Sequence, residues 1–213
     1  MVRPIRRIVA GNDDSGKAVA LSDGPSRDVI LDPARPGYAS TRLWETDSSP
    51  ARVSGIRETL TTRHRLAPPP NGTQCRFIEL PPDKVWMGRV QESDVASWFA
   101  SMGSVLSQTS GPHPYMQRTM SLDLCYVLEG QATLVLDTQE VQLDAGSAVI
   151  INGASHAWSN RSDAPAIVIL SQHGGVSDRA PEPPSAPATG KEPVEPPPEI
   201  ARLIRREIGR AHV

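Results

Sequence analysis

The sequence predicts an all-β protein, an antiparallel barrel or sandwich, and two observations carry this prediction. From residue 122 onward, five short apolar runs follow one another: LDLCYVLEG, ATLVLD, EVQLDAG, SAVIING and AIVILS. Glycine, aspartate and serine turns separate the runs, and short strands at such spacing are typical of closed antiparallel sheets. Before residue 176, only residues 93–102 show a clear helical period.

The N-terminal part adds further strands. Residues 6–10 (RRIVA) and 17–21 (KAVAL) flank the turn sequence GNDDSG, and this arrangement predicts a hairpin. Residues 41–45 (TRLWE) form a third candidate strand because they contain apolar side chains that can pack on a core.

A further strand is predicted over residues 74–80 (QCRFIEL), which alternate in polarity. We expect Cys75, Phe77 and Leu80 to form its buried side. The preceding residues 47–71 are polar and rich in turn formers, so they predict an ordered loop.

Residues 93–102 predict an amphipathic helix. Its apolar stripe, at positions i, i+3, i+4 and i+7, consists of Val95, Trp98, Phe99 and Met102. Ser93 can cap the start of the helix and Gly103 can end it. The helix either packs on the outside of a sheet or forms a lid near the mouth of a pocket.

Composition excludes several functional classes. The 213 residues are 38% hydrophobic and carry a net charge of −2, which gives no reason to expect a nucleic-acid partner or binding to a membrane surface. No window approaches 18 consecutive apolar residues, and the basic N-terminus lacks a signal-like apolar run. The two cysteines have no CxxC spacing, which favours a reducing compartment. We therefore expect a cytoplasmic protein.

The composition changes near residue 175, and this change predicts the domain organisation. Residues 1–175 form the β-barrel domain, with N-terminal strands over 5–46 and the motif region over 111–160. Residues 176–198 hold eight of the 21 prolines and predict an extended linker. Residues 199–213 resume a helical pattern with apolar residues on one face, and this helix docks on its own barrel, docks on a partner, or frays.

Spacing within residues 111–160 resembles the two motifs of the cupin superfamily, G(X)5HXH(X)3,4E(X)6G and G(X)5PXG(X)2H(X)3N. The first motif aligns without a gap on Gly111, Gln117, Thr119, Asp123 and Gly130. The second motif is one residue short and aligns on Gly146, Gly153, His156 and Asn160. Segments across residues 5–171, among them LWETD, YVLEG and NGASHAWSN, are similar to a narrower group of small single-domain cupins. The resemblance implies a double-stranded β-helix, or jelly roll, with one or two peripheral helices.

The chain departs from the superfamily pattern where metal ligands are expected. Metal-dependent cupins hold a divalent ion with three imidazoles and one carboxylate. Here Gln117 and Thr119 replace the two histidines of the first motif, and Asp123 replaces its glutamate. We therefore expect no cofactor. If iron, manganese, zinc or nickel were bound, the ligands would be His156, Asp123 and Gln117, with His113 as a substitute.

The motif positions also predict site residues, because side chains two residues apart on a strand lie on the same face. His156 is the candidate acid or base and Asp123 its partner; otherwise His156 is a hydrogen-bonded core residue. Polar contacts to a substrate are expected from Gln117, Arg118 and Thr119. Aromatic lining is expected from Trp158 and, less directly, from Tyr115, Tyr126 and Trp44.

Three functions stay open at this point. The first is an enzyme acting on a small, largely apolar organic carbonyl or carboxylate compound by decarboxylation, dehydration or isomerisation, or a metal-dependent dioxygenase or lyase if metal is retained. The second is a non-catalytic module that binds such a compound. The third is a structural dimer with an empty pocket. Resemblance to cupins also implies a homodimer, with the hairpin over residues 6–21 as the pairing element.

Overall fold

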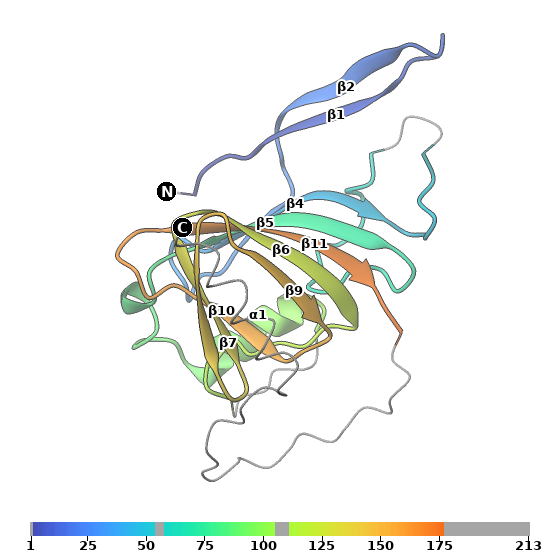
Figure 1. The fold of residues 1–213 in the computed structure, drawn as a ribbon. Helices are drawn as coiled ribbons and strands as arrows, with labels where there is room; N and C mark the ends of the chain where they lie inside the picture. The colour runs from blue at the N-terminus through green and yellow to red at the C-terminus, as the bar shows by residue number, and fades with distance from the viewer. Residues whose placement is uncertain (1, 54–57, 105–110, 177–213) are drawn as a thin grey trace, which may run out of the picture. The chain divides into compact units, whose positions relative to one another are not determined.

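Strands dominate the computed structural model (Figure 1), which describes residues 2–53, 58–104 and 111–176. The described strands are β1 (Arg6–Asn12), β2 (Ala18–Pro25), β3 (Val29–Leu31), β4 (Ala39–Thr46), β5 (Thr73–Leu80), β6 (Ser121–Glu129), β7 (Gln131–Leu136), β8 (Glu140–Asp144), β9 (Ala148–Asn152), β10 (His156–Ser159) and β11 (Ala166–Gly174). The helices of the same part are the 3-10 helix η1 (Asp83–Val85) and α1 (Glu92–Ser101). None of these helices is long and apolar enough to cross a membrane. The predicted all-β class with few helices is confirmed.

The chain divides into two compact units, residues 1–178 and 179–213. The first unit contains all the strands named above. The predicted helix over residues 199–213, and the predicted linker over 176–198 beyond its first residue, lie outside the described residues.

Two antiparallel sheets enclose the core of the first unit. One sheet has the strand order β3-β4-β5-β11-β6-β9, and the other has the order β10-β7-β8. Buried apolar side chains from both sheets form one cluster between them, which includes Ile78, Val127, Leu134, Trp158 and Leu170. The strands β1 and β2 form a separate two-stranded ribbon, so the predicted N-terminal hairpin is confirmed.

The strand β6 shows how the sequence directs side chains into the barrel. Asp123 and Cys125 are buried, whereas Tyr126 is exposed. This follows from the alternation of side chains across a strand. The strand ends at Glu129, and the next residue, Gly130, has a φ of +74°. A Cβ atom at this position would lie 2.7 Å from the carbonyl oxygen of Pro165. A glycine is required at this turn for both reasons.

The strand β5 lies where it was predicted, but it buries a different face. Its buried side chains are Gln74, Arg76, Ile78 and Leu80. Cys75 and Phe77, which were expected inside, are only half-buried. The expected face is corrected because this part of the barrel interior is polar: Gln74 donates a hydrogen bond from Nε2 to Gln172 Oε1 at 3.1 Å.

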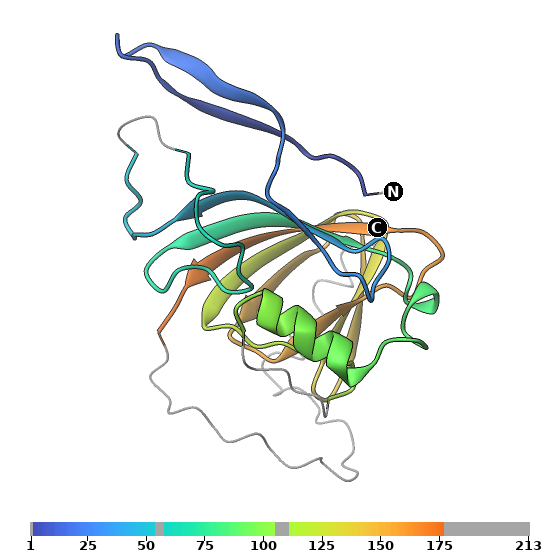
Figure 2. The same cartoon turned by 180° about the vertical axis from the view of Figure 1, so that it is seen from behind.

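The helix α1 lies across the barrel (Figure 2) and buries the predicted apolar stripe, Val95, Trp98 and Phe99, followed by Met102. It begins at Glu92, and the Asp94 carboxylate accepts a hydrogen bond from the backbone N–H of Gln91 at 2.9 Å. Gln91, and not Ser93, is therefore the N-terminal cap. The ring of Trp98 meets that of Tyr38 edge to face at 5.1 Å between centroids. The helix thus packs against the barrel and also contributes a side chain to its interior.

Candidate functional site

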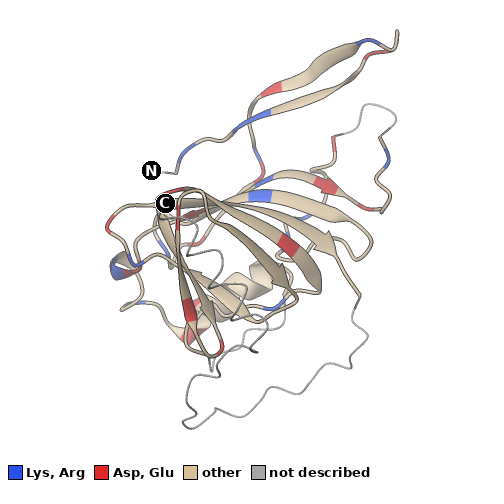
Figure 3. Ribbon diagram, in the orientation of Figure 1, with Lys and Arg blue, Asp and Glu red and all other residues tan. Residues whose placement is uncertain are grey.

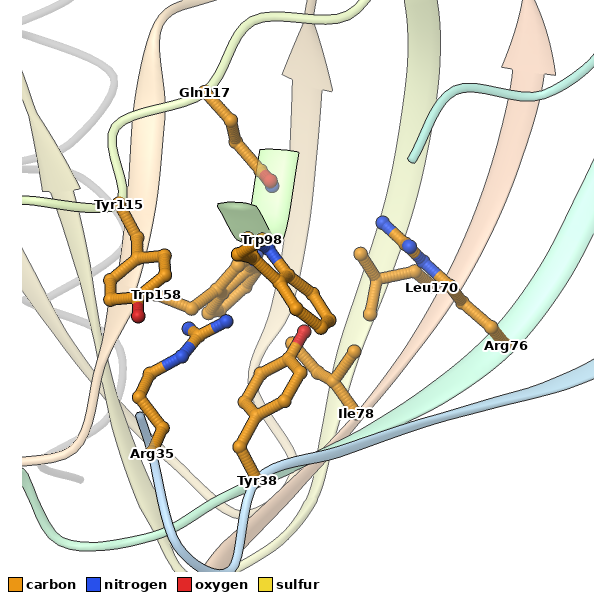
Figure 4. A pocket seen from close by; sticks show the side chains of 9 residues that line it. All are labelled: Arg35, Tyr38, Arg76, Ile78, Trp98, Tyr115, Gln117, Trp158 and Leu170. Atoms are coloured by element: carbon orange, nitrogen blue, oxygen red, sulfur yellow. The ribbon is translucent and has the colours of Figure 1, made fainter. Parts of the chain in front are cut away.

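A small cavity lies inside the barrel (Figure 4). Its volume is about 20 Å³, which is room for about one or two water molecules. It is lined by Arg35, Tyr38, Arg76, Ile78, Trp98, Tyr115, Gln117, Trp158 and Leu170. These residues come from the loop before β4, from β5, from α1, from the loop before β6, and from β10 and β11. Segments far apart in the sequence therefore meet at one space.

Three of the predicted site residues line this cavity: Tyr115, Gln117 and Trp158. His156 lies next to Gln117, because the two residues exchange backbone hydrogen bonds of 2.7 and 2.9 Å in an isolated β-bridge. Their side chains also meet, with 3.1 Å between Gln117 Nε2 and His156 Nε2. The structure thus joins the predicted pocket residues of the loop before β6 to those of β10.

The hydrogen bonds of His156 assign its tautomer. Its Nδ1 lies 2.9 Å from the carbonyl oxygen of Ala154, which can only accept, so Nδ1 carries the proton. Its Nε2 is then the acceptor for the Gln117 amide. Burial lowers the pKa of His156, so the neutral ring is favoured. Both ring nitrogens are occupied, and proton transfer by His156 to a substrate would require Gln117 to move away.

Asp123 is not hydrogen-bonded to His156 in the part of the chain that the structure describes. Its Oδ2 accepts a hydrogen bond from Gln172 Nε2 at 2.9 Å, and Gln172 in turn accepts one from Gln74. Its Oδ1 is buried without a partner among the described residues. The carboxylate is therefore held by a chain of amides that crosses three strands, and the expected direct pair with His156 is not formed.

Arg118 and Thr119 lie away from the cavity. Both line a separate surface groove of about 540 Å³. Arg118 donates from Nε to the carbonyl oxygen of Gly153 at 2.9 Å, and the Thr119 hydroxyl accepts a hydrogen bond from Ser121 Oγ at 2.8 Å. Their contacts are with the protein itself, and the structure does not bring them to the cavity.

Trp44 and Tyr126 do not line the cavity either, which corrects the expected aromatic lining. Tyr126 is 42% exposed because it occupies an outward position of β6. Trp44 is half-buried, and the guanidinium of Arg7 lies 5.5 Å from its ring centroid. Both rings belong to the outside of the barrel.

Six lining residues were not expected from the sequence as site residues: the aliphatic Ile78 and Leu170, and the polar or aromatic Arg35, Tyr38, Arg76 and Trp98. Arg35 and Tyr38 precede β4 in a stretch without periodicity, and Trp98 belongs to a stripe that a packed helix explains. Only Arg76 could have been recognised from the sequence pattern. It alternates with Ile78 on one face of β5, so a buried Ile78 requires a buried arginine.

The guanidinium of Arg35 is fixed by rings and by one carboxylate. It lies 3.8 Å from the ring centroid of Tyr38 and 3.6 Å from that of Tyr115, a stacked cation–π arrangement. Its Nε donates to Asp32 Oδ2 at 2.6 Å, and both side chains are buried. The charge of Arg35 is therefore matched within the protein, while its planar head stays at the cavity wall.

Several buried polar atoms of the cavity wall have no hydrogen-bond partner among the described residues. They are Arg35 Nη2, Arg76 Nε and Nη1, Tyr115 Oη and Trp158 Nε1. Figure 4 shows the heads of Arg35, Arg76 and Gln117 directed toward the same space. Burial raises the pKa of Tyr115, and the nearby Asp32 carboxylate acts in the same direction, so its phenol stays protonated. Unpaired buried donors are costly, and a cluster of them around one cavity indicates a place for an acceptor-bearing molecule.

The residues at the cupin ligand positions do not fit a divalent metal. His156 Nε2 accepts a hydrogen bond from Gln117, and the Thr119 hydroxyl accepts one from Ser121. One imidazole and one carboxylate with an amide and a hydroxyl form a poor donor set for iron, manganese, zinc or nickel. Across residues 2–53, 58–104 and 111–176, no three His, Cys, Asp or Glu side chains gather into a group that could hold a metal ion.

His113, the expected substitute ligand, is a core residue. It is buried, its Nδ1 accepts a hydrogen bond from the backbone N–H of Tyr115 at 3.1 Å, and its ring meets Trp86 edge to face. Burial lowers its pKa to about 4, so it is neutral at physiological pH. It does not line the cavity.

A serine, a histidine and an aspartate form a hydrogen-bonded chain elsewhere in the barrel. Ser40 Oγ lies 3.0 Å from His64 Nε2, and His64 Nδ1 lies 2.8 Å from Asp28 Oδ1. Ser40 is completely buried and lines neither the barrel cavity nor the surface groove. A nucleophile requires space for the substrate carbon beside its oxygen, so this chain serves to fasten the loop that carries His64 to β4.

Residues 108–171 match the family model described as the cupin domain. No curated protein matches the chain. A putative ethanolamine utilization protein Q from Salmonella typhimurium is 10% identical over 82% of this chain and 99% of its own, with a TM-score of 0.40. A cupin 2 conserved barrel domain protein from Salinispora arenicola is 12% identical over 64% of this chain and 75% of its own, with a TM-score of 0.35. Similarities this low carry no argument about activity.

Proposed function

Since this chain is a member of the cupin superfamily, we propose that its barrel interior is a metal-free binding site for a small, largely apolar organic compound with a carbonyl or carboxylate group. The observation that carries the proposal is the set of donors on the cavity wall that have no hydrogen-bond partner among the described residues, contributed by Arg35, Arg76 and Trp158. Ligand pockets are apolar spaces with a few convergent polar groups. The rings of Tyr38, Trp98 and Trp158 supply the apolar walls.

Binding without turnover is favoured over catalysis by the state of His156. Its two ring nitrogens are held by Ala154 and Gln117. A general acid or base must instead reach the proton that it transfers. Acid–base chemistry of the lyase type is the second candidate, and a single observation favours it: the Oδ1 atom of buried Asp123 has no partner in the described ranges and is a free acceptor.

A ligand screen tests this proposal. Small aromatic acids, keto acids and neutral aromatic compounds are added to the protein, and binding is read from the thermal midpoint and from tryptophan fluorescence, since Trp98 and Trp158 line the cavity. We expect at least one compound to bind saturably. Tyr115→Phe, which alters the cavity wall, should weaken this binding, whereas the matched variant Tyr126→Phe on the outer face should not. Absence of binding throughout the screen would contradict the proposal.

Metal analysis tests its metal-free part. The protein is purified without chelators and its metal content is compared with that of His156→Ala. We expect substoichiometric metal in both proteins because the donor set is poor. Near-stoichiometric metal that disappears in His156→Ala would overturn the metal-free assignment and restore dioxygenase or lyase chemistry.

We further propose a homodimer that forms through the outer face of the six-stranded sheet. The strands β9 and β11 carry no Lys, Arg, Asp or Glu (Figure 3). Exposed apolar side chains on β6 and β9 are Leu122, Leu124, Tyr126, Leu128 and Ile150. An uncharged face of this kind marks an interface, and a second copy offers an identical face to it. The hairpin over residues 6–21 is the other candidate surface for the dimer.

The free cysteines, Cys75 and Cys125, favour a cytoplasmic location.

A further inference from the structure

Two arginines face each other across β4 and β5, and only one of them is paired. Arg42 and Arg76 are partners in the antiparallel register, and their exposed fractions are 0% and 2%. Like charges directly opposite each other on a sheet are destabilising. The pair therefore requires compensation from other groups.

Arg42 is fully compensated inside the protein. Its Nη2 lies 2.6 Å from Asp28 Oδ2, and its Nη1 donates to Glu45 Oε2 at 2.7 Å. Its Nη2 also donates to the carbonyl oxygen of Thr62 at 2.6 Å. This guanidinium has two carboxylates and a carbonyl around it, so its partners account for its burial.

Arg76 has no comparable partner. Its Nε and Nη1 are buried without a hydrogen bond, and no carboxylate in residues 2–53, 58–104 or 111–176 forms an ion pair with it. Burial lowers its pKa, while the charge of Asp123 acts in the opposite direction from beyond ion-pair distance. A guanidinium does not lose its proton in proteins, so Arg76 remains a buried cation that forms no ion pair with a described residue and feels the charge of Asp123 only from a distance.

The cavity is the place where this charge can be matched. Arg76 lines it, and Figure 4 shows its side chain beside Leu170 at the cavity wall. Arg35 lines the same cavity, but its charge is matched by Asp32. Among the described residues, the wall therefore offers donors without hydrogen-bond partners and one guanidinium without an ion pair. Its natural complement is one negative charge on an oxygen acceptor, next to a group that fits between aromatic rings.

We propose that the ligand of the barrel is a small monocarboxylate whose carboxylate group is the counter-ion of Arg76. This inference rests on the proposed function and narrows it to one class of compound. The Arg35 guanidinium and the Trp158 indole N–H supply further donors to the carboxylate, and the aromatic rings contact the organic part. Because the cavity of about 20 Å³ is no larger than a site for water, its walls must separate as the ligand enters. Probes of graded size measure how far they separate.

Matched acids and amides test the proposal. Acetate, propionate and benzoate are compared with acetamide, propionamide and benzamide at constant ionic strength and chloride, by titration calorimetry and thermal shift. We expect at least one acid to bind the natural protein at least tenfold more tightly than its amide. Arg76→Met should lose this preference, while Arg76→Lys should keep it at reduced affinity because the charge remains.

The outcomes separate this inference from the proposed function. If amides bind as tightly as their acids, the cavity binds ligands but Arg76 does not select carboxylates, and the inference is wrong while the proposed function stands. Equal acid binding by a folded Arg76→Met would also overturn it. If the acids, the amides and the compounds of the wider screen all fail to bind, the proposed function fails as well. Acid-selective binding that Arg76→Met abolishes and Arg76→Lys retains supports both.

Discussion

Replacement of Arg42 and of Arg76 by methionine should have opposite effects on stability, although the two arginines are cross-strand partners. Methionine keeps an unbranched side chain of similar length and removes the charge. Arg42→Met leaves Asp28 and Glu45 without their cation, and their side chains are only 17% and 9% exposed. Arg76→Met breaks no ion pair within the described part of the chain, and the nearby Asp123 keeps its hydrogen bond from Gln172.

The expected magnitudes follow from these partners. Removal of one member of a buried ion pair costs about 3–5 kcal/mol, because the remaining charge stays buried. Arg42→Met should lie near the lower end of this range, since Asp28 keeps the hydrogen bond from His64. Exchange of buried charges for well-packed apolar groups is neutral or stabilises by up to ~4 kcal/mol. We therefore expect Arg76→Met to be at least as stable as the natural protein, and about 3 kcal/mol or more above Arg42→Met.

Urea unfolding at pH 7, followed by tryptophan fluorescence in a buffer free of carboxylates, measures both free energies of unfolding. If Arg42→Met does not fold, Glu45→Gln replaces it, because this variant removes one partner of Arg42 and keeps the shape of the side chain. A loss of stability in Arg76→Met as large as that in Arg42→Met would refute the reasoning. Arg76 would then have structural partners, and its burial would say nothing about a ligand.

Three further predictions concern the histidines, the second motif and the outer face. Burial lowers the pKa of His113 from 6.5 to about 4, so the unfolded chain binds this proton more readily than the folded protein. The free energy of unfolding should therefore fall by roughly 3 kcal/mol as the pH drops from about 6.5 to about 4. In urea titrations, His113→Asn should reduce this dependence on pH. Asn160 donates from Nδ2 to the carbonyl oxygens of Leu80 and Ala164 at 2.9 and 2.8 Å, so Asn160→Ala should lower the free energy of unfolding by about 2–3 kcal/mol. Leu124 is 45% exposed on the proposed dimer face, and Leu124→Lys should convert the dimer to a monomer in sedimentation velocity.

Each of these predictions has an outcome that contradicts it. An unchanged acid profile in His113→Asn would mean that His64 and His156, whose pKa values burial also lowers, dominate the pH dependence. Full stability of Asn160→Ala would show that water replaces its two carbonyl contacts. A natural protein that sediments as a monomer would remove the proposed dimer, whatever the behaviour of Leu124→Lys.

The sequence was sufficient for most of the strands, because their signal is local, but β3 and β10 were not among the predicted apolar runs. The alternation in β6, with Asp123 and Cys125 inside and Tyr126 outside, can be read from the residue order. Turn glycines such as Gly130 mark the strand ends for a physical reason, the positive φ that the turn requires. The cupin spacing placed Gln117 and His156, which belong to different motifs, at one site, and the structure joins them in a β-bridge that was not predicted.

The sequence was not sufficient for the polar interior. The alternation in β5 was assigned with the apolar Cys75 and Phe77 inside, whereas Gln74 and Arg76 are buried. Periodicity shows which side chains of a strand share a face. When the barrel interior contains partners for polar groups, or a cavity, only the tertiary structure decides which of the two faces is buried. For the same reason Arg35, from a loop without periodicity, could not be recognised as a lining residue.

A crystal structure of the protein, grown without chelators and with benzoate, tests the central claim most directly. We predict that benzoate occupies the barrel cavity, with a carboxylate oxygen about 3 Å from a nitrogen of Arg76. The benzoate ring should lie among the rings of Tyr38, Trp98 and Trp158. A metal ion held by His156, Asp123 and Gln117, or a cavity that contains only water at saturating benzoate, would contradict it.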